Sequence, residues 1–434
     1  MVKVPYRGSI RKLVLAFDVG TTYSAISYCI LDPGEVPKIE PVTRYPAQEW
    51  KLHLRTRNLA ANHITDDDIP PLPRGKNAVE VLGDFMQYLF RCARSYIEEA
   101  HPSGSHLWRS LENRIEFVLT HPNGWEGPQQ KQIRLSAVLG GLVPSTEDGM
   151  ARVHLLTEGE ASLHYCVHNT LASDTLSKTP ILASDDGVRS PGQGVVVIDA
   201  GEGTIDLSAY SMSMTLSPTL IEEIAAAECR LQGSVFVTRR ARGLLQEKLS
   251  GSRYGTPDVI QHIIDIFDST TKLRFCNPED PAYIKFGTIR DRDPQHDIRN
   301  GQLKLSGQDV AKLFEPSISS IIEAFETQRR AAGTPVTFVF FTGNFAASDW
   351  MFSKLQAYFQ SLGIGFSRPD NHCNKAIADG AVLYFINHLV SSRVSRFTYG
   401  TECSVPFNPF DVEHRARQKE VFRNTNFSNS SLRR

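Results

Sequence analysis

Two segments far apart in the chain share residue types that could hold a polyphosphate. Residues 13–22 and 195–204 each contain an aliphatic, β-branched run followed by Asp-x-Gly and a threonine. Glycine lets the backbone approach phosphate with its N–H groups free, threonine adds a hydroxyl donor, and aspartate can hold a hydrated cation. Because Mg²⁺ keeps several waters and uses one or two carboxylates beside phosphate oxygens, one aspartate per segment suits it.

Each segment needs a pair of strands to position it. A return strand follows at residues 23–30 in the first copy and at 205–212 in the second, so the sequence predicts two β-hairpins. A single Asp-x-Gly favours an ordinary turn. Two copies, each between strands of buried type, favour the phosphate-binding interpretation.

Composition bounds the class of protein. A chain of 434 residues exceeds what one hydrophobic core usually fills, which predicts two lobes. The net charge of -1 argues against nucleic acid or anionic lipid as the main partner. Seven scattered cysteines, without a Cys-x-x-Cys pair, indicate free thiols in a reduced compartment. We see no apolar run that could span a bilayer and no signal core, and therefore expect a soluble protein of the cytoplasm or nucleus.

Strands alternate with helices along the first half of the chain. The spacing of apolar residues predicts a long amphipathic helix from residue 77, a strand at 115–122 and a helix at 129–139. A strand at 153–156 leads directly into Glu158 and a further helix. Proline-rich residues 33–46 read as an extended or looped segment.

The second half repeats this alternation. Helices are predicted at 234–249, at 259–274 and at 313–330. The strongly β-prone residues 334–342 then run into Gly343-Asn344, a turn before a helix N-terminus that suits a nucleoside or a phosphate. Such alternation is the pattern of α/β layers.

The order of these parts resembles the actin-like ATPase fold, most specifically the nucleotide-binding domain of the heat-shock protein 70 family. Residues 13–28 and 195–210 resemble the two phosphate hairpins of that family, 117–142 its interlobe strand and helix, and 336–350 its adenosine motif. Asp379-Gly380-Ala381 is similar to part of its closing helix. The resemblance implies an α/β fold of two ribonuclease H-like duplicated domains, arranged as two lobes around a nucleotide cleft.

The resemblance also implies boundaries. Lobe I would comprise residues 1–190, with a peripheral subdomain at 46–112. Lobe II would comprise residues 191–390, with a peripheral subdomain at 229–302 and a helix at 376–390 that returns to lobe I. Residues 391–434 would form a short, partly disordered extension, too short for the peptide-binding domain of the family.

Site roles follow from the resemblance, position by position. Asp18 and Asp199 would hold hydrated Mg²⁺, and Glu158, with Asp206 nearby, would orient the attacking water or accept its proton. Lys51 is the candidate for a lysine near the γ-phosphate, although a solvated surface lysine is an equal alternative. ATP or ADP would lie against Gly20, Thr21, Thr22, Tyr23, Gly201, Glu202, Gly203, Thr204, Gly233, Asp268, Lys272, Gly343 and Asn344.

Two of these roles have plainer alternatives. Glu158 could be a helix N-terminal carboxylate that interacts with the helix dipole. Asp268 and Lys272 could be an exposed ion pair four residues apart on one helix face.

The sequence departs from the family pattern at the second hairpin. Glu202 stands between Gly201 and Gly203, where the family has glycine. A carboxylate about 5 Å from the phosphates would cost about 3 kcal/mol per unit of phosphate charge at an effective dielectric constant near 20. Either this side chain turns away or nucleotide affinity suffers. Gly159-Glu160 also replaces a Pro-Thr pair, and Thr342 replaces a glycine.

Three functions are compatible with these residues. The first is a slow, magnesium-dependent ATPase whose lobe closure is sensed by protein partners, and the second is a nucleotide-binding scaffold without turnover. The third, a small-molecule kinase, shares the two phosphate hairpins but would need a polar substrate motif that we do not find.

Overall fold

The computed structural model describes residues 4–20, 24–42, 71–171, 192–213, 220–369 and 375–395 of the main part of the chain. Residues 404–406, 408–416, 421–423 and 430–433 are described near the C-terminus. Residues 1–394 form one compact unit and residues 395–434 a second. Among the described residues, no helix is long and apolar enough to cross a membrane.

The first sheet has five strands in the order β3-β2-β1-β4-β5. β1 (Lys12–Val19) pairs antiparallel with β2 (Ser24–Leu31), which pairs antiparallel with β3 (Ile39–Val42). On its other side, β1 pairs parallel with β4 (Ile115–His121), and β4 pairs parallel with β5 (Val153–Thr157). The predicted first hairpin is therefore present, and the proline-rich segment that we expected to be extended or looped contains the edge strand β3.

The second sheet repeats this plan. β6 (Gln193–Ala200) pairs antiparallel with β7 (Ile205–Ser213), and β7 with β8 (Leu220–Arg230). β12 (Val336–Thr342) lies parallel to β6, and β13 (Gly365–Ser367) parallel to β12. The order β8-β7-β6-β12-β13 thus matches β3-β2-β1-β4-β5 strand for strand, with β14 (Val390–Ser392) added at the β8 edge.

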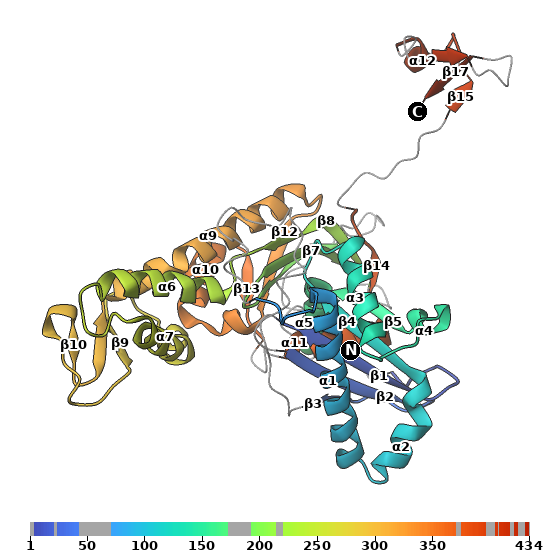
Figure 1. The fold of residues 1–434 in the computed structure, drawn as a ribbon. Helices are drawn as coiled ribbons and strands as arrows, with labels where there is room; N and C mark the ends of the chain where they lie inside the picture. Colours follow the sequence, from blue (N-terminus) through green and yellow to red (C-terminus); the bar gives the residue numbers. More distant parts are fainter. Residues whose placement is uncertain are drawn as a thin grey trace. The chain divides into compact units, whose positions relative to one another are not determined.

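Helices cover both faces of each sheet (Figure 1). On one face of the first sheet, alternate β1 side chains pack with α1 (Ala78–Ala100) and α3 (Pro128–Leu139) in one apolar core. The opposite face packs against α11 (Ala376–Asn387). Strand side chains alternate between faces, so the buried runs of β1 and β6 reflect helices on both sides.

The second sheet is covered in the same way. One face packs against α5 (Glu158–Leu171). The other shares its core with α6 (Ser234–Lys248), α9 (Gly307–Ala331) and α10 (Asp349–Ser361). Helices α5 and α11 pack against each other, so this helix pair lies between the two sheets.

Shorter elements complete the first unit. They are α2 (Gly104–Leu111), η4 (Glu112–Arg114), α4 (Glu147–Ala151), α7 (Pro257–Ile266), η5 (Phe267–Thr271), α8 (Lys272–Arg274), β9 (Ala282–Lys285), η6 (Pro294–His296), β10 (Ile298–Arg299), β11 (Gln302–Leu305) and η7 (Asn344–Ala347). Strands β10, β11 and β9 form a separate small sheet.

Two predicted helices differ in detail. The helix expected at 259–274 is divided, because the five residues of η5 wind as a π-helix between α7 and α8. The helix expected at 313–330 begins earlier, at Gly307, where the Ser306 hydroxyl accepts the Asp309 N–H at 3.0 Å and caps it.

The second unit contains β15 (Ser404–Pro406), α12 (Val412–Ala416), β16 (Val421–Arg423) and β17 (Ser430–Arg433). Its three strands are antiparallel in the order β15-β17-β16.

Candidate functional site

Four carboxylates, three from the two sheets and one from α5, gather near the N-terminus of α5. Asp18 is the second-last residue of β1 and Asp199 the second-last residue of β6. Asp206 faces Asp199 across the second hairpin, and Glu158 is the first residue of α5. All four side chains are buried, with exposed fractions of 8% or less. The corresponding position of the first hairpin, opposite Asp18, is Ala25, so Asp206 is an addition of the second copy.

Asp199 shows how strongly these groups interact. Burial raises the pKa of its carboxyl well above the usual range, and the charges of Glu158, Asp206 and Asp18 raise it further. One oxygen accepts the Ser162 hydroxyl at 3.3 Å, while the buried Oδ1 has no hydrogen-bond partner among the described residues. An acidic cluster with an unsatisfied carboxylate oxygen is suited to a cation.

Neighbouring residues hold two of the other carboxylates. The Thr120 hydroxyl, at the end of β4, donates to Asp18 Oδ1 at 3.0 Å. The Asn123 N–H donates to Asp206 Oδ1 at 2.6 Å, across the two sheets. The Asn123 amide also donates to Ser208 Oγ at 3.0 Å, so the loop after β4 is fastened to the second hairpin.

The Asn123 contacts explain the glycine that follows Glu158. A Cβ at Gly159 would lie 2.4 Å from Ser208 Oγ and 3.0 Å from the Asn123 amide nitrogen. The start of α5 must therefore approach the second hairpin more closely than a side chain permits. Sequence reasoning missed Thr120, Asn123 and Ser162, because no motif surrounds them.

The turn of the second hairpin forms the cap of α6. The Gly201 N–H donates to the Thr204 carbonyl at 2.9 Å and closes the turn. The Ser234 N–H then donates to the Gly201 carbonyl at 3.2 Å, and the Val235 N–H to the Glu202 carbonyl at 2.9 Å. These bonds satisfy N–H groups that a helix start leaves unpaired.

Two glycines make this contact possible. A Cβ at Gly233 would lie 2.2 Å from the Glu202 carbonyl oxygen, so the predicted glycine has a steric role at the start of α6. Gly343 has a φ of +89°, and a Cβ there would lie 2.3 Å from the Ala200 carbonyl oxygen. The turn after β12 is thereby brought against the end of β6.

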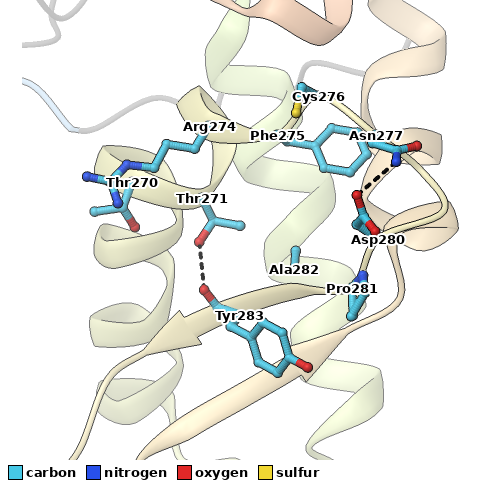
Figure 2. Close-up of a pocket in the computed structure, with 10 residues that line it drawn as sticks. All are labelled: Thr270, Thr271, Arg274, Phe275, Cys276, Asn277, Asp280, Pro281, Ala282 and Tyr283. Carbon is cyan, nitrogen blue, oxygen red and sulfur yellow. Dashed lines mark hydrogen bonds between the residues drawn. The ribbon is translucent and has the colours of Figure 1, made fainter.

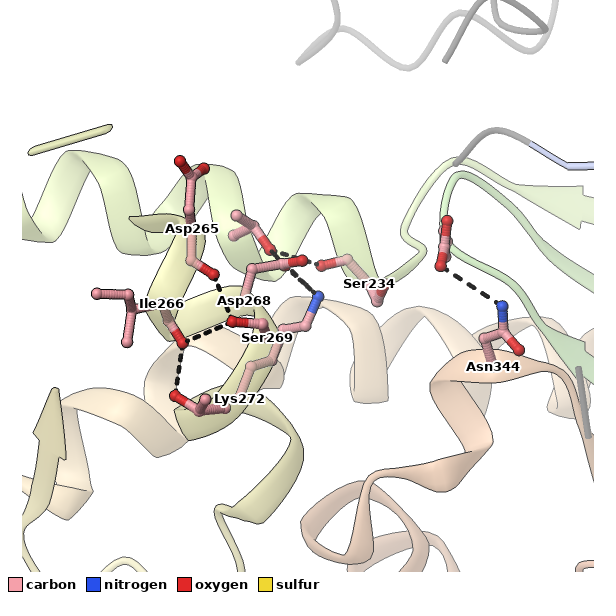
Figure 3. A network of polar contacts seen from close by, with 10 residues as sticks. Ser234, Asp265, Ile266, Asp268, Ser269, Lys272 and Asn344 are labelled. Atoms are coloured by element: carbon pink, nitrogen blue, oxygen red, sulfur yellow. Dashed lines mark hydrogen bonds and ion pairs between the residues drawn. The ribbon is translucent and has the colours of Figure 1, made fainter. Parts of the chain in front are cut away.

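Glu202 points toward the turn after β12. Its Oε1 accepts the side-chain N–H of Asn344 at 3.5 Å (Figure 3). The Oε2 atom of Glu202 is buried. Asn344 Oδ1 is also buried, and this amide oxygen has no hydrogen-bond partner among the described residues. In this structure the Glu202 carboxylate is thus directed toward the turn after β12, the candidate adenosine motif.

Asp268 and Lys272 form an ion pair across the π-helix, with 2.5 Å between Nζ and Oδ1 (Figure 3). Lys272 also donates to the Thr238 hydroxyl at 3.3 Å, and Thr238 donates to Asp268. The ion pair four residues apart is therefore present, with the Lys272 side chain 7% exposed and the Asp268 side chain 47% exposed. The pair fastens η5 to α6, one helical turn from the second hairpin.

Several predicted site residues lie outside the described part of the chain. They are Thr21, Thr22 and Tyr23 of the first turn, and Lys51. Gly20 is described and directly precedes the first of them. Within the described ranges, no group of three or more His, Cys, Asp and Glu side chains is arranged to hold a metal directly.

A pocket of about 200 Å³ lies beside the π-helix (Figure 2). Thr271 donates to the Tyr283 carbonyl at 3.4 Å on one side of it, and Asn277 donates to Asp280 at 2.8 Å on the other. The lining is Thr270, Thr271, Arg274, Phe275, Cys276, Asn277, Asp280, Pro281, Ala282 and Tyr283. None of these residues belongs to the acidic cluster, so the pocket is separate from the predicted site.

The fold and the cluster define a mixed α/β protein in which two equivalent hairpins bring their aspartates together. The chain is 22% identical, over 446 residues, to heat shock 70 kDa protein 12A of Homo sapiens, and 22% identical, over 447 residues, to the same protein of Mus musculus. Each match covers 86% of this chain and 62% of the relative. No family model matches the chain.

These matches give a distant relationship to heat-shock-70-like proteins. The mixed α/β sheets are consistent with the actin-like ATPase fold of such relatives. The chain spans about 62% of the length of the curated relatives that it matches, so the activity of a whole relative is not transferred with the resemblance.

Proposed function

We propose that residues 1–394 form a nucleotide-binding domain of the heat-shock-70-like kind, which holds ATP or ADP with Mg²⁺ between the two hairpins. The observation that carries the proposal is the meeting of Asp18, Asp199 and Glu158 at the start of α5. Three carboxylates from separate elements are costly to bury together unless a ligand compensates them. The distant relationship to heat-shock-70-like proteins supports the same conclusion.

Each group has a proposed role. Asp18 and Asp199 hold the hydrated Mg²⁺, which supplies charge compensation for the phosphates. Gly20 and Gly203 present backbone N–H groups, while Gly201 keeps its N–H on the Thr204 carbonyl and closes the turn between them. Asp268, Lys272 and Asn344 border the nucleoside. Glu158 orients a water or accepts its proton, and the contact of Asn123 with Asp206 fixes the second hairpin relative to it.

Turnover, where it occurs, is slow. In this proposal the two sheets form lobes that close on nucleotide, and a protein partner senses that closure at α5 and α11. A nucleotide-binding scaffold without hydrolysis is the second candidate. The feature that favours it is Glu202, a carboxylate in the second hairpin at a position where the heat-shock 70 family has glycine.

Calorimetry on the full chain tests binding. We expect MgATP and MgADP to bind and the affinity to fall when EDTA removes the metal. No detectable binding of either nucleotide at millimolar concentration would remove the proposed function.

Turnover separates the two candidates. If Glu158 acts on the water, Glu158→Gln should slow Mg-dependent ATP hydrolysis roughly 100-fold or more while leaving MgADP affinity unchanged. Glu247→Gln removes a charge from the exposed last turn of α6 and serves as the matched control. Equal rates in wild type and Glu158→Gln would reject the catalytic role, and a rate no higher than the buffer alone would favour the scaffold.

A further inference from the structure

The pair formed by Glu202 and Asn344 lies between the parts that the proposed function assigns to phosphates and to the nucleoside. Glu202 belongs to the turn of the second hairpin, and Asn344 to the turn after β12. The close approach of Gly343 to the Ala200 carbonyl holds these two turns together. The pair is therefore positioned by backbone contacts and not by its own hydrogen bond, which is long at 3.5 Å.

The chemistry of the pair is dominated by acceptors. An ionised carboxylate offers only acceptor oxygens, and one amide N–H of Asn344 is already used on it. Asn344 Oδ1 is buried and has no hydrogen-bond partner within the described part of the chain. A buried acceptor without a donor costs free energy, so the pair is complementary to a group that brings donors.

Phosphate oxygens cannot supply those donors, because an ionised phosphate accepts and repels the carboxylate. Adjacent hydroxyl groups can supply them. A carboxylate that accepts a ribose hydroxyl is the arrangement by which dinucleotide-binding sheets recognise a ribose.

We infer that Glu202 is a specificity-determining residue, which with Asn344 accepts hydrogen bonds from the ribose hydroxyls of the bound nucleotide. The inference rests on the proposed function and deepens it. In this inference Glu202, in the turn of the second hairpin, binds the ribose and not the phosphates. Its carboxylate must then remain directed toward Asn344 when nucleotide is bound.

The test compares MgADP with its 2′-deoxy and 3′-deoxy analogues by calorimetry on the full chain. Wild type should bind MgADP roughly 10- to 100-fold more tightly than at least one deoxy analogue, the loss expected for a hydrogen bond to a charged group. In Glu202→Ala this ratio should fall to about 1–3, because affinity for MgADP drops while affinity for that analogue does not.

Two further variants keep the experiment decisive. Glu202→Gln retains an acceptor without the charge and should give an intermediate ratio, which also covers the case in which the alanine variant fails to fold. Glu247→Ala, on the exposed last turn of α6, should keep the wild-type ratio. Thermal unfolding without nucleotide checks that each variant is folded.

The outcomes separate the two proposals. MgADP binding with the same ribose-to-deoxyribose ratio in wild type and both Glu202 variants would overturn this inference and leave the proposed function standing. Wild-type binding that is indifferent to both hydroxyls would do the same. Absence of MgADP binding to the wild type would overturn both.

Discussion

Asp199 carries an electrostatic cost that should be measurable. Its pKa is raised by burial and by three neighbouring carboxylates, so the ionised form of Asp199 is less favourable in the folded protein than in the unfolded chain. The acidic cluster therefore lowers the free energy of unfolding of the protein. Such a cost is expected at a binding site and not in an ordinary core.

Replacing Asp199 should raise the stability of the protein and weaken its binding of Mg²⁺ with nucleotide. In EDTA, Asp199→Asn should raise the free energy of unfolding by about 1–2 kcal/mol, because the repulsion with Glu158, Asp206 and Asp18 is relieved. The same variant should lose any stabilisation by Mg²⁺ with nucleotide. Denaturant unfolding with and without ligand measures both effects, and Asp265→Asn on the exposed side of α7 is the control. A destabilised Asp199→Asn in EDTA would contradict the interpretation.

A second buried polar group lies further along α5. His164 is fully buried, and neither ring nitrogen has a hydrogen-bond partner among the described residues. Burial lowers the pKa of His164 to about 3, and burial raises the pKa of Glu223, on β8, to about 7. These two groups should act on stability in opposite directions.

The signs follow from proton binding. For His164 the unfolded chain, with a pKa near 6.5, binds the proton first, so the free energy of unfolding falls as pH drops from 6.5 toward 3. For Glu223, whose pKa is higher in the folded protein, the folded protein binds more protons than the unfolded chain between pH 4.5 and 7. The free energy of unfolding therefore falls as pH rises across this range. Each slope is at most about 1.4 kcal/mol per pH unit, and they oppose each other where they overlap.

Single variants should separate these slopes. Between pH 5 and 6.5, His164→Phe should make the free energy of unfolding decline more with rising pH than in wild type, and Glu223→Gln should make it rise more. Urea unfolding across this range measures both. Identical pH profiles in wild type and the two variants would show that neither group titrates differently on folding.

At the scale of elements, the turns around the site are fixed by backbone contacts. The second hairpin caps α6, and the turn after β12 is pressed against the end of β6 through Gly343. Since these contacts involve carbonyl oxygens, a side chain cannot be accommodated by rotamer changes alone.

Gly343→Ala tests this packing. The φ of +89° disfavours alanine, and its Cβ would meet the Ala200 carbonyl oxygen and Asp199 Oδ1. We expect a loss of roughly 2–4 kcal/mol in the free energy of unfolding, together with weaker nucleotide binding. Gly333→Ala is the matched control, because nothing lies within 4 Å of a Cβ there and its φ is not in the disfavoured range. Equal stability of the two variants would mean that the turn can move away.

At the scale of the whole first unit, α5 connects the site to the last strand of the second sheet. Arg393, just after β14, donates to both oxygens of Glu160 at 2.8 and 2.6 Å, two residues from Glu158. The Glu160 side chain is 5% exposed, whereas that of Arg393 is 53% exposed. Loss of the arginine would leave a buried carboxylate without its cation.

A double-mutant cycle measures this connection. Arg393→Met should lower the free energy of unfolding by roughly 1–3 kcal/mol, a range that allows for solvent screening of the exposed guanidinium. Adding Glu160→Gln to the Arg393→Met chain should recover most of this lost stability. Chemical denaturation of the two single variants and the double variant gives the coupling. Additive losses would show that the two side chains stabilise the unit independently.

The sequence by itself determined the local features of this protein. These features are the two hairpins, the aspartates near their turns and the helix that starts at Glu158. They depend on the alternation of side chains along strands and on neighbouring turn residues, which act over a few positions. The repeated Asp-x-Gly therefore predicted two equivalent hairpins before any packing was known.

Tertiary structure decided which side chains meet. Asn123 reaches Asp206, 83 residues away, and Ser162 reaches Asp199, because α5 lies between two sheets of the same strand order. The direction of Glu202 was open in the sequence, since a turn residue can point to either side until a neighbouring turn, here that of Asn344, is packed beside it. Local pattern fixes elements, while contacts between distant residues depend on how those elements pack.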